Sequence, residues 1–364
     1  MRTGMAESCA MGERLLKKER ISDLCMAACK DWEVYLPLEH MGGDVQFVRL
    51  EADEGSESLN RLKLDYDRLV VPPKAVAFPQ LESLFRFDRD EITESVAATG
   101  RKVLFGVRAC DLRGIRFLDQ FFREGFDDPY YCARSASTLV IVVVCTRPNP
   151  YCFCTSAGTG PSLPAPYAVV QGSDAGFDVQ MTDIGDAYVV EAGSAQGQDF
   201  VGLYNAFEGS VPPEAIEHAR RAKQEAAEAV RLRIEFDRAI QRFCEDRVPQ
   251  RLYERIAERC IYCGGCAYVC PTCNCFGVFD EKKGDWGRRC RVWDGCMFEG
   301  YTRQAGGHNP RFEKWTRTAR RYEHKLKYDY LETGRSGCVG CGRCLASCPV
   351  NIGMSQVIEE VASL

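Results

Sequence analysis

Two copies of one cysteine run constrain this chain more than any other feature. The stretch CIYCGGCAYVCP holds Cys260, Cys263, Cys266 and Cys270, and the stretch CVGCGRCLASCP holds Cys338, Cys341, Cys344 and Cys348. Both follow the spacing C-x2-C-x2-C-x3-C-P, which holds [4Fe-4S] clusters in bacterial ferredoxins. The alternatives are zinc sites and buried free thiols. Zinc sites usually separate two cysteine pairs by a dozen or more residues, so the spacing favours two [4Fe-4S] clusters.

The spacing also predicts how the ligands divide. In two-cluster ferredoxins the fourth cysteine of each run binds the cluster of the other run. We therefore expect one cluster on Cys260, Cys263, Cys266 and Cys348, and the other on Cys338, Cys341, Cys344 and Cys270. Glycines between the ligands leave room for backbone N–H groups to point at sulfur. Two clusters with interleaved ligands lie side by side and suit a relay of single electrons.

Composition indicates the setting of these runs. The chain has 21 cysteines among 364 residues and no apolar leader pattern, which argues for metal ligation in a reducing compartment, and we expect a cytoplasmic protein. A formal net charge of −5 gives no reason to expect nucleic acid as a partner. The longest strongly apolar run, 139–145, is far shorter than the roughly 20 residues of a membrane helix, so we expect no transmembrane segment.

The first half of the chain has the pattern of a parallel α/β unit. Residues 102–107 (KVLFGV) and 139–144 (LVIVVV) read as buried strands, and a further strand is expected at 68–71 before two prolines. An amphipathic helix follows the first of the buried strands, with Asp111 as its expected N-cap. Two buried strands joined through a helix predict a parallel pair with a right-handed crossover.

Four cysteines follow the expected ends of these strands. Cys110 and Cys145 come just after them, and Cys152 and Cys154 follow closely. Since ligands gather at the carboxyl edge of open α/β sheets, the four predict a third [4Fe-4S] cluster. A zinc site, a Cys-x-Cys redox pair and unliganded thiols remain the alternatives. Asp111 could also approach such a metal, although helix capping is the role that we expect.

The fold class predicted is α+β and multidomain. An N-terminal α/β domain (1–210) is followed by a helical connector (211–250), read as one long helix over 212–246, and by a two-cluster ferredoxin domain (251–364) with a long insertion (271–337). Neither G-x-G-x-x-G nor a P-loop occurs, so we expect no flavin or NAD on this chain.

The insertion carries further cysteines and a basic stretch. Cys273, Cys275 and Cys296 could form another metal site or pack as buried thiols, and the role of Cys290 stays open. Residues 311–335 hold eight Lys or Arg against four Asp or Glu, which is typical of a solvated face or of docking to an acidic partner.

Three cysteines near the N-terminus, Cys9, Cys25 and Cys29, are expected to be incidental thiols. Cys25 and Cys29 could open a radical-SAM run, but Trp32 stands where the third ligand would be.

An ordered set of motifs resembles one family. The set comprises GVRACDL (106–112), DPYY (128–131), CFCTSAGTGP (152–161), CPTCNCF (270–276), WDGC (293–296), GGHN (306–309), HK (324–325) and CVGCGRC (338–344). It is similar to the iron–sulfur β subunit of sulfhydrogenases and to the A subunit of anaerobic sulfite reductases, from about residue 100 to 355. Cys290 and the three N-terminal cysteines are not part of that pattern.

The resemblance implies an iron–sulfur electron-transfer subunit without catalysis of its own. Its partners would be a flavin-containing subunit that binds NAD(P)H and a catalytic redox subunit of the hydrogenase, sulfite reductase or heterodisulfide-reductase type. One alternative is a stand-alone reductase that binds substrate at an open iron in the N-terminal domain. A zinc-dependent interaction module is another.

Overall fold

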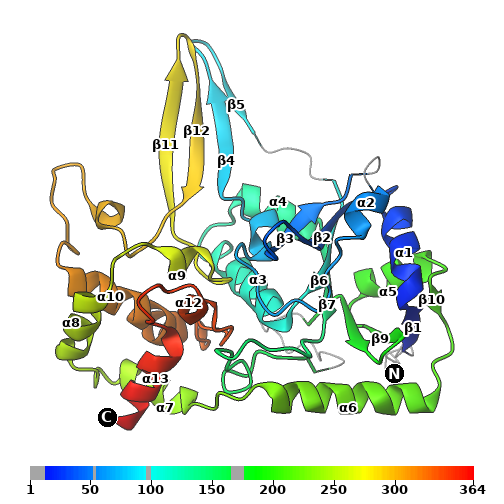
Figure 1. Cartoon of the computed structure of the whole chain (residues 1–364). Coiled ribbons are helices and arrows are strands. Elements are labelled where there is room, and N and C mark those ends of the chain that lie inside the picture. The colour runs from blue at the N-terminus through cyan, green and yellow to red at the C-terminus, as the bar shows by residue number, and fades with distance from the viewer. Residues whose placement is uncertain (1–12, 52–54, 96–99, 165–175) are drawn as a thin grey trace, which may run out of the picture.

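The computed structural model describes residues 13–51, 55–95, 100–164 and 176–364, so Cys9 lies outside the described residues (Figure 1). The strands are β1 (Arg14–Lys17), β2 (Glu33–Glu39), β3 (Val45–Arg49), β4 (Leu81–Phe87), β5 (Ile92–Glu94), β6 (Lys102–Val107), β7 (Thr138–Val143), β8 (Val179–Asp183), β9 (Ala187–Ala192), β10 (Phe207–Glu208), β11 (Phe276–Lys283) and β12 (Trp286–Trp293). The α-helices are α1 (Ile21–Ala28), α2 (Gly55–Leu59), α3 (Ala109–Phe121), α4 (Pro129–Ala136), α5 (Ala195–Leu203), α6 (Pro213–Ala229), α7 (Phe236–Cys244), α8 (Gln250–Arg259), α9 (Gly265–Tyr268), α10 (Lys314–Glu323), α11 (Asp329–Thr333), α12 (Arg343–Ala346) and α13 (Met354–Ser363). Short 3-10 turns lie at Lys18–Arg20, Pro73–Val76 and Glu299–Thr302, and a π-helical turn, η4, spans His324–Tyr328.

The first half of the chain builds a mixed sheet. Within the described residues it has eight strands in the order β10-β1-β9-β8-β7-β6-β2-β3. Strands β2, β6, β7 and β8 run parallel, and the outer strands pair antiparallel. Every residue of β6 is buried, as expected for a parallel strand covered on both faces. The predicted buried strands and their parallel pairing are therefore confirmed.

The strand predicted at 68–71 is wrong, because those residues are irregular. Just before them, the carbonyls of Leu64 and Tyr66 accept hydrogen bonds from the guanidinium of Arg108, at 2.8 and 2.6 Å. A side chain thus satisfies backbone groups that a neighbouring strand would otherwise bond.

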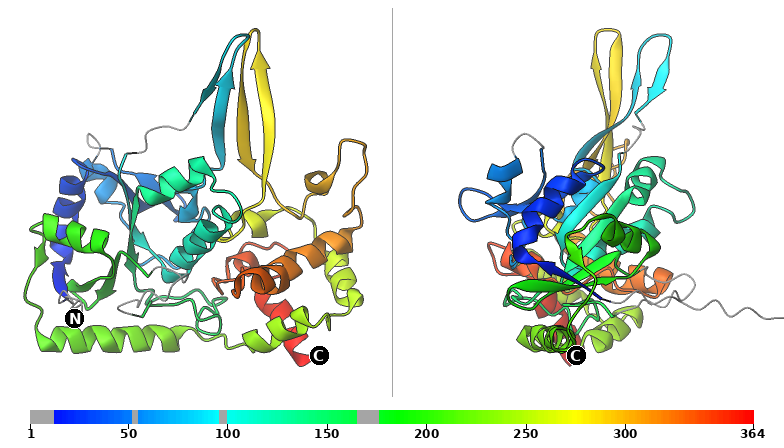
Figure 2. Two further views of the ribbon diagram at one scale, coloured as in Figure 1. Left: turned by 180° about the vertical axis from the view of Figure 1, so that it is seen from behind. Right: turned by 90° about the vertical axis from the view of Figure 1, so that its right-hand side faces the viewer.

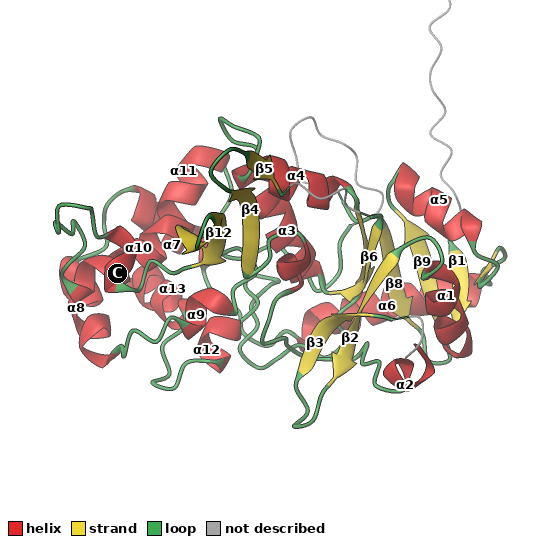
Figure 3. Ribbon diagram, turned by 90° about the horizontal axis from the view of Figure 1, so that it is seen from above, coloured by secondary structure: helices red, strands yellow, loops and turns green. Residues whose placement is uncertain are grey.

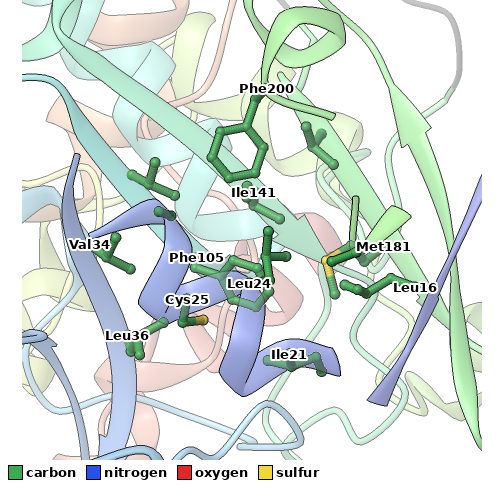
Figure 4. Packing of buried hydrophobic residues seen from close by; sticks show 14 of the residues in the cluster. Leu16, Ile21, Leu24, Cys25, Val34, Leu36, Phe105, Ile141, Met181 and Phe200 are labelled. Carbon is green, nitrogen blue, oxygen red and sulfur yellow. The ribbon is translucent and has the colours of Figure 1, made fainter. Parts of the chain in front are cut away.

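One face of the sheet is covered by a large apolar core (Figure 4). Phe105, Ile141 and Met181 from the strands pack there with Leu24 of α1 and Phe200 of α5. Cys25 lies in the same core at 1% exposure, and burial raises the pKa of its thiol. Cys29 packs against this core from its edge. The environment of both residues is that of the packed thiols expected from the sequence.

The helix predicted over 212–246 is two helices, α6 and α7, separated at 230–235. Val230 is buried against Cys152 and Cys154, and the backbone N–H of Ile234 donates to Ser156 Oγ at 3.1 Å. These tertiary contacts draw the chain out of the helix, because they offer its backbone other partners. Helix α6 runs below the sheet in the view of Figure 1 and leads toward α7 and the C-terminal helices (Figures 1 and 2).

The C-terminal part is helical and lies beside the sheet (Figure 3). Helices α7, α8, α10 and α13 share a second core, with Phe243, Ile256, Tyr322 and Ile358 among its members. Cys244 of α7 packs at the edge of this core. The two cysteine runs lie in and around the short helices α9 and α12, and Cys338 and Cys344 of the second run pack against this core.

A four-stranded arm projects from the body (Figures 1 and 2). Its order is β11-β12-β4-β5, so the insertion of the second half pairs antiparallel with a segment of the first half. At its base, Trp293 packs with Phe78 and Phe122, and its indole N–H donates to the carbonyl of Phe78 at 3.0 Å. The arm therefore joins two segments that are distant in the sequence.

Arg291 on β12 fixes the base of this arm. Its side chain is 2% exposed and pairs with Glu82 of β4 at 2.5 Å and with Asp128 at 2.5 Å. Asp128 is also the N-cap of α4, since it accepts from the backbone N–H of Tyr131 at 2.8 Å. Removing the cation would take a buried charge partner from Asp128 and from Glu82, which would keep only its second pair, with Arg134.

We expect Arg291→Ala to lower the free energy of unfolding by about 3–5 kcal/mol, the usual cost of breaking a buried ion pair. Urea unfolding followed by tryptophan fluorescence measures it. Arg289→Ala is the matched control, because Arg289 lies on the same strand, is 44% exposed and pairs with Asp280. Its loss should have a much smaller effect, because an ion pair exposed to solvent contributes little to stability. Equal effects of the two variants would contradict the assignment of Arg291.

Candidate iron–sulfur centres

The eight cysteines of the two runs line two cavities. Cys260, Cys263, Cys266 and Cys348 line the first cavity, together with Ile256, Tyr322 and Ile352. Cys270, Cys338, Cys341 and Cys344 line the second, together with Phe153 and Met354. Each cavity thus takes three cysteines from one run and the fourth from the other. This is the grouping that the spacing predicts for two clusters with crossed ligands.

The cysteines surround these cavities rather than converge on a point. Within the described ranges, no three His, Cys, Asp or Glu side chains meet closely enough to hold a single metal ion. A [4Fe-4S] cluster takes four thiolates around one cubane, so its ligands stand apart around a hollow. The donor set of each cavity, four soft thiols with a buried cation beside them, fits such a cluster.

Equivalent glycines shape the two runs. Gly264 and Gly342 both have left-handed backbone, with φ of 73° and 67°, and each precedes the short helix that carries the third cysteine of its run. A Cβ on Gly342 would lie 2.4 Å from the carbonyl oxygen of Tyr151. Only glycine therefore lets the segment around Cys152 lie directly against the second run.

The cysteines expected to hold a third cluster, Cys110, Cys145, Cys152 and Cys154, neighbour one another beside the second cavity. The thiol of Cys152 lies 3.5 Å from the carbonyl oxygen of Cys341, and the backbone N–H of Phe153 donates to the carbonyl of Gly340 at 2.8 Å. Burial and the neighbouring Cys145 raise the pKa of Cys152 to about 11. Burial, Cys152 and Cys145 raise the pKa of Cys154 to about 12.

Cys110 completes this third group. Burial raises the pKa of its thiol well above the ordinary value, and both Cys154 and Cys341 are among the thiols that interact with it. At neutral pH such thiols are protonated when free. Metal binding would deprotonate them and release protons. Whether they hold a third cluster is taken up under the proposed function.

The role expected for Asp111 is wrong. Helix α3 begins at Ala109 with Arg108 before it, and the carboxylate of Asp111 is fully buried. It forms a bidentate ion pair with Arg343, in which Nη1 and Nη2 each donate to one carboxylate oxygen at 2.5 Å. Because Arg343 stands between Cys341 and Cys344 in the sequence, this pair ties the α/β part to the second run.

The basic stretch at 311–335 is in part buried, which corrects its reading as a solvated or docking face. Arg317, Arg321 and Lys325 are each 5% exposed. The ammonium of Lys325 donates to Thr272 Oγ1 at 2.7 Å and to the carbonyl of Gly337 at 3.0 Å, and Lys325 lines the second cavity. It lies in the π-helical turn η4, a form common at functional sites.

Three of the remaining cysteines of the insertion form thiol pairs, one of them with Cys270. The thiol of Cys273 is hydrogen-bonded to that of Cys270, and the thiol of Cys275 to that of Cys296. The ammonium of Lys74 donates to the carbonyl of Cys273, and burial lowers the pKa of Lys74 to about 8. Cys290 is fully buried on β12 in the arm.

Sequence reasoning missed the buried cations Lys74, Arg321, Lys325 and Arg343. Arg343 and Lys325 had a signal, since one lies between two ligands and the other is part of the HK motif. Neither signal indicated that the side chain would be buried and not exposed to solvent.

This arrangement of two crossed cavities defines an iron–sulfur protein with a two-cluster ferredoxin domain. Residues 259–352 match the family model described as a 4Fe-4S dicluster domain. Over 313 residues the chain is 32% identical to the sulfhydrogenase 2 subunit beta of Pyrococcus furiosus, an overlap that covers 85% of this chain and 88% of that protein. The chain belongs to the sulfhydrogenase β subunit family, as the motifs predicted. In the described part of the chain, no helix is both long and apolar enough to cross a membrane.

Crossed ligation makes a prediction for Cys348. We expect Cys348→Ser to lose or perturb the same cluster as Cys263→Ser, because both residues line the first cavity. Cys270→Ser should instead match Cys341→Ser. Iron analysis and EPR spectra of the reduced proteins measure this, with Cys244→Ser as a control outside both cavities. If the Cys348→Ser spectrum matched that of Cys341→Ser, the crossed assignment would be wrong.

Proposed function

We propose that this chain relays single electrons between a flavin-containing subunit that oxidises or reduces NAD(P)H and a catalytic redox subunit. The protein would work in the cytoplasm, with two [4Fe-4S] clusters in the crossed cavities and a third on Cys110, Cys145, Cys152 and Cys154. The observation that carries the proposal is the contiguity of the three cysteine groups. The third group touches the second run through Cys152 and Cys341, and Arg321 lines both crossed cavities.

The exposure of the cysteines supports a contact between the first cluster and a partner subunit. Cys263 is exposed and its neighbour Ile261 is 60% exposed, so the first cavity reaches the surface. Cys152 and Cys154 are buried. A partner subunit that covers Ile261 and Cys263 would bring its own redox centre close to the first cluster. The catalytic partner would be of the hydrogenase, sulfite reductase or heterodisulfide-reductase type.

The third cluster can be tested by counting iron. Protein purified without oxygen should hold roughly twelve irons per chain, and the double variant Cys152→Ser, Cys154→Ser should hold roughly eight. The two remaining clusters should keep their EPR signals. Cys25→Ala is the control, since Cys25 lies in the apolar core of the sheet. A wild-type count near eight would refute the third cluster, and a count near four would refute the crossed pair as well.

The relay itself can be tested with NADH and NADPH. We expect neither to reduce the clusters of the isolated chain, because the chain carries no dinucleotide motif. Adding the flavin-containing subunit that co-purifies with the tagged chain should restore reduction, seen as bleaching of the iron–sulfur absorption. Substrate turnover by the isolated chain would instead support a stand-alone reductase with an open iron.

A further inference from the structure

Arg321 occupies a position that no other charged residue of the described chain shares. It lies near the end of α10 and is the one residue that lines both crossed cavities. From there its guanidinium reaches the first run, where Nη2 donates to the carbonyl of Cys266 at 3.2 Å. A single buried cation therefore stands between two sites that are each lined by four cysteines.

The charge of Arg321 has no carboxylate to balance it in the described part of the structure. The groups that interact with its charge are the thiols of Cys266, Cys344 and Cys273 and the phenol of Tyr322. Its Nη1 group is buried and has no hydrogen-bond partner among the described residues. A buried cation with an unbonded N–H is costly unless an anionic acceptor satisfies it. Both cavities beside this group are lined by cysteines and fit an anionic cluster.

We propose that Arg321 is a bridging cation that donates an N–H from Nη1 to a sulfur of one cluster and raises the reduction potentials of both. This rests on the proposed function only in requiring that the two crossed cavities hold clusters. Reduction adds an electron to a group that is already negative, and a nearby positive charge favours the more negative form. Hydrogen bonds to cluster sulfur act in the same direction.

Lys325 is a neighbouring buried cation against which the role of Arg321 can be compared. It lies one turn beyond Arg321, is equally buried, and lines the second cavity but not the first. Its charge should therefore act mainly on the second cluster. Arg317 lies one turn before Arg321 and is also buried, but it lines neither cavity and donates to the carbonyls of Arg311 and Phe312.

The test is a redox titration followed by EPR on three charge-removing variants. Arg321→Met should shift the potentials of both clusters to more negative values. Lys325→Met should shift mainly that of the second cluster, and Arg317→Met should leave both nearly unchanged. The clusters are identified by the signals that Cys263→Ser and Cys341→Ser remove. A shift of only one cluster, or of none, in Arg321→Met would overturn the bridging role.

Two further measurements separate the effect of the charge from that of the hydrogen bond. Arg321→Lys retains the charge, so it should assemble and shift both potentials less than the loss of charge does. Protein with arginine labelled by 15N should show a nitrogen coupling to a reduced cluster in pulsed EPR, and Arg321→Lys should abolish that coupling. Absence of the coupling in a wild-type protein with two intact clusters would refute the hydrogen bond while leaving the relay standing. If wild-type protein held no two clusters, the proposed function itself would fail.

Discussion

The buried ion pair between Asp111 and Arg343 is the interaction on which the rest of the arrangement depends. It joins the first turn of α3 to α12, and so it joins the sheet to the second cysteine run. A buried pair contributes little net stability over apolar packing, but its geometry is demanding. The pair therefore serves to fix the position of α12 relative to α3. Cys110 precedes Asp111 and Cys341 lies two residues before Arg343, so the pair sets how the third cysteine group meets the second cavity.

The insertion between the two cysteine runs provides buried positive charge beside the second cavity. A plain ferredoxin run brings thiols and backbone N–H groups, but the second cavity here is also lined by Arg321 and Lys325 from α10 and η4. The same insertion supplies β11 and β12 of the arm, which are fixed to the first half through Arg291. One segment thus provides both buried cations and a connection between the two halves, which explains why it is long.

The sequence was sufficient where spacing or burial follows from local pattern. Identical spacings predicted the two groups of cysteines that line the cavities, and apolar β-branched runs predicted β6 and β7. The sequence was insufficient where contacts with distant segments determine the local structure. The break between α6 and α7 depends on hydrogen bonds to the segment after Cys154, and Asp111 was read as a cap because its partner lies far along the chain. The burial of Arg321 and Lys325 was likewise invisible in a count of charges.

These features together support a relay with fixed ends over a diffusing carrier. A small ferredoxin exposes its clusters to any partner, whereas here the second cavity is enclosed by the segment around Cys152 on one side and by α10 and η4 on another. Electrons would enter or leave it through the neighbouring sites. The first cavity has an exposed edge at Cys263, which gives one partner a defined contact. The order of the three cysteine groups is thus set by packing, and a cation shared by the two crossed cavities would make the potentials of the clusters proposed there respond to the same local charge.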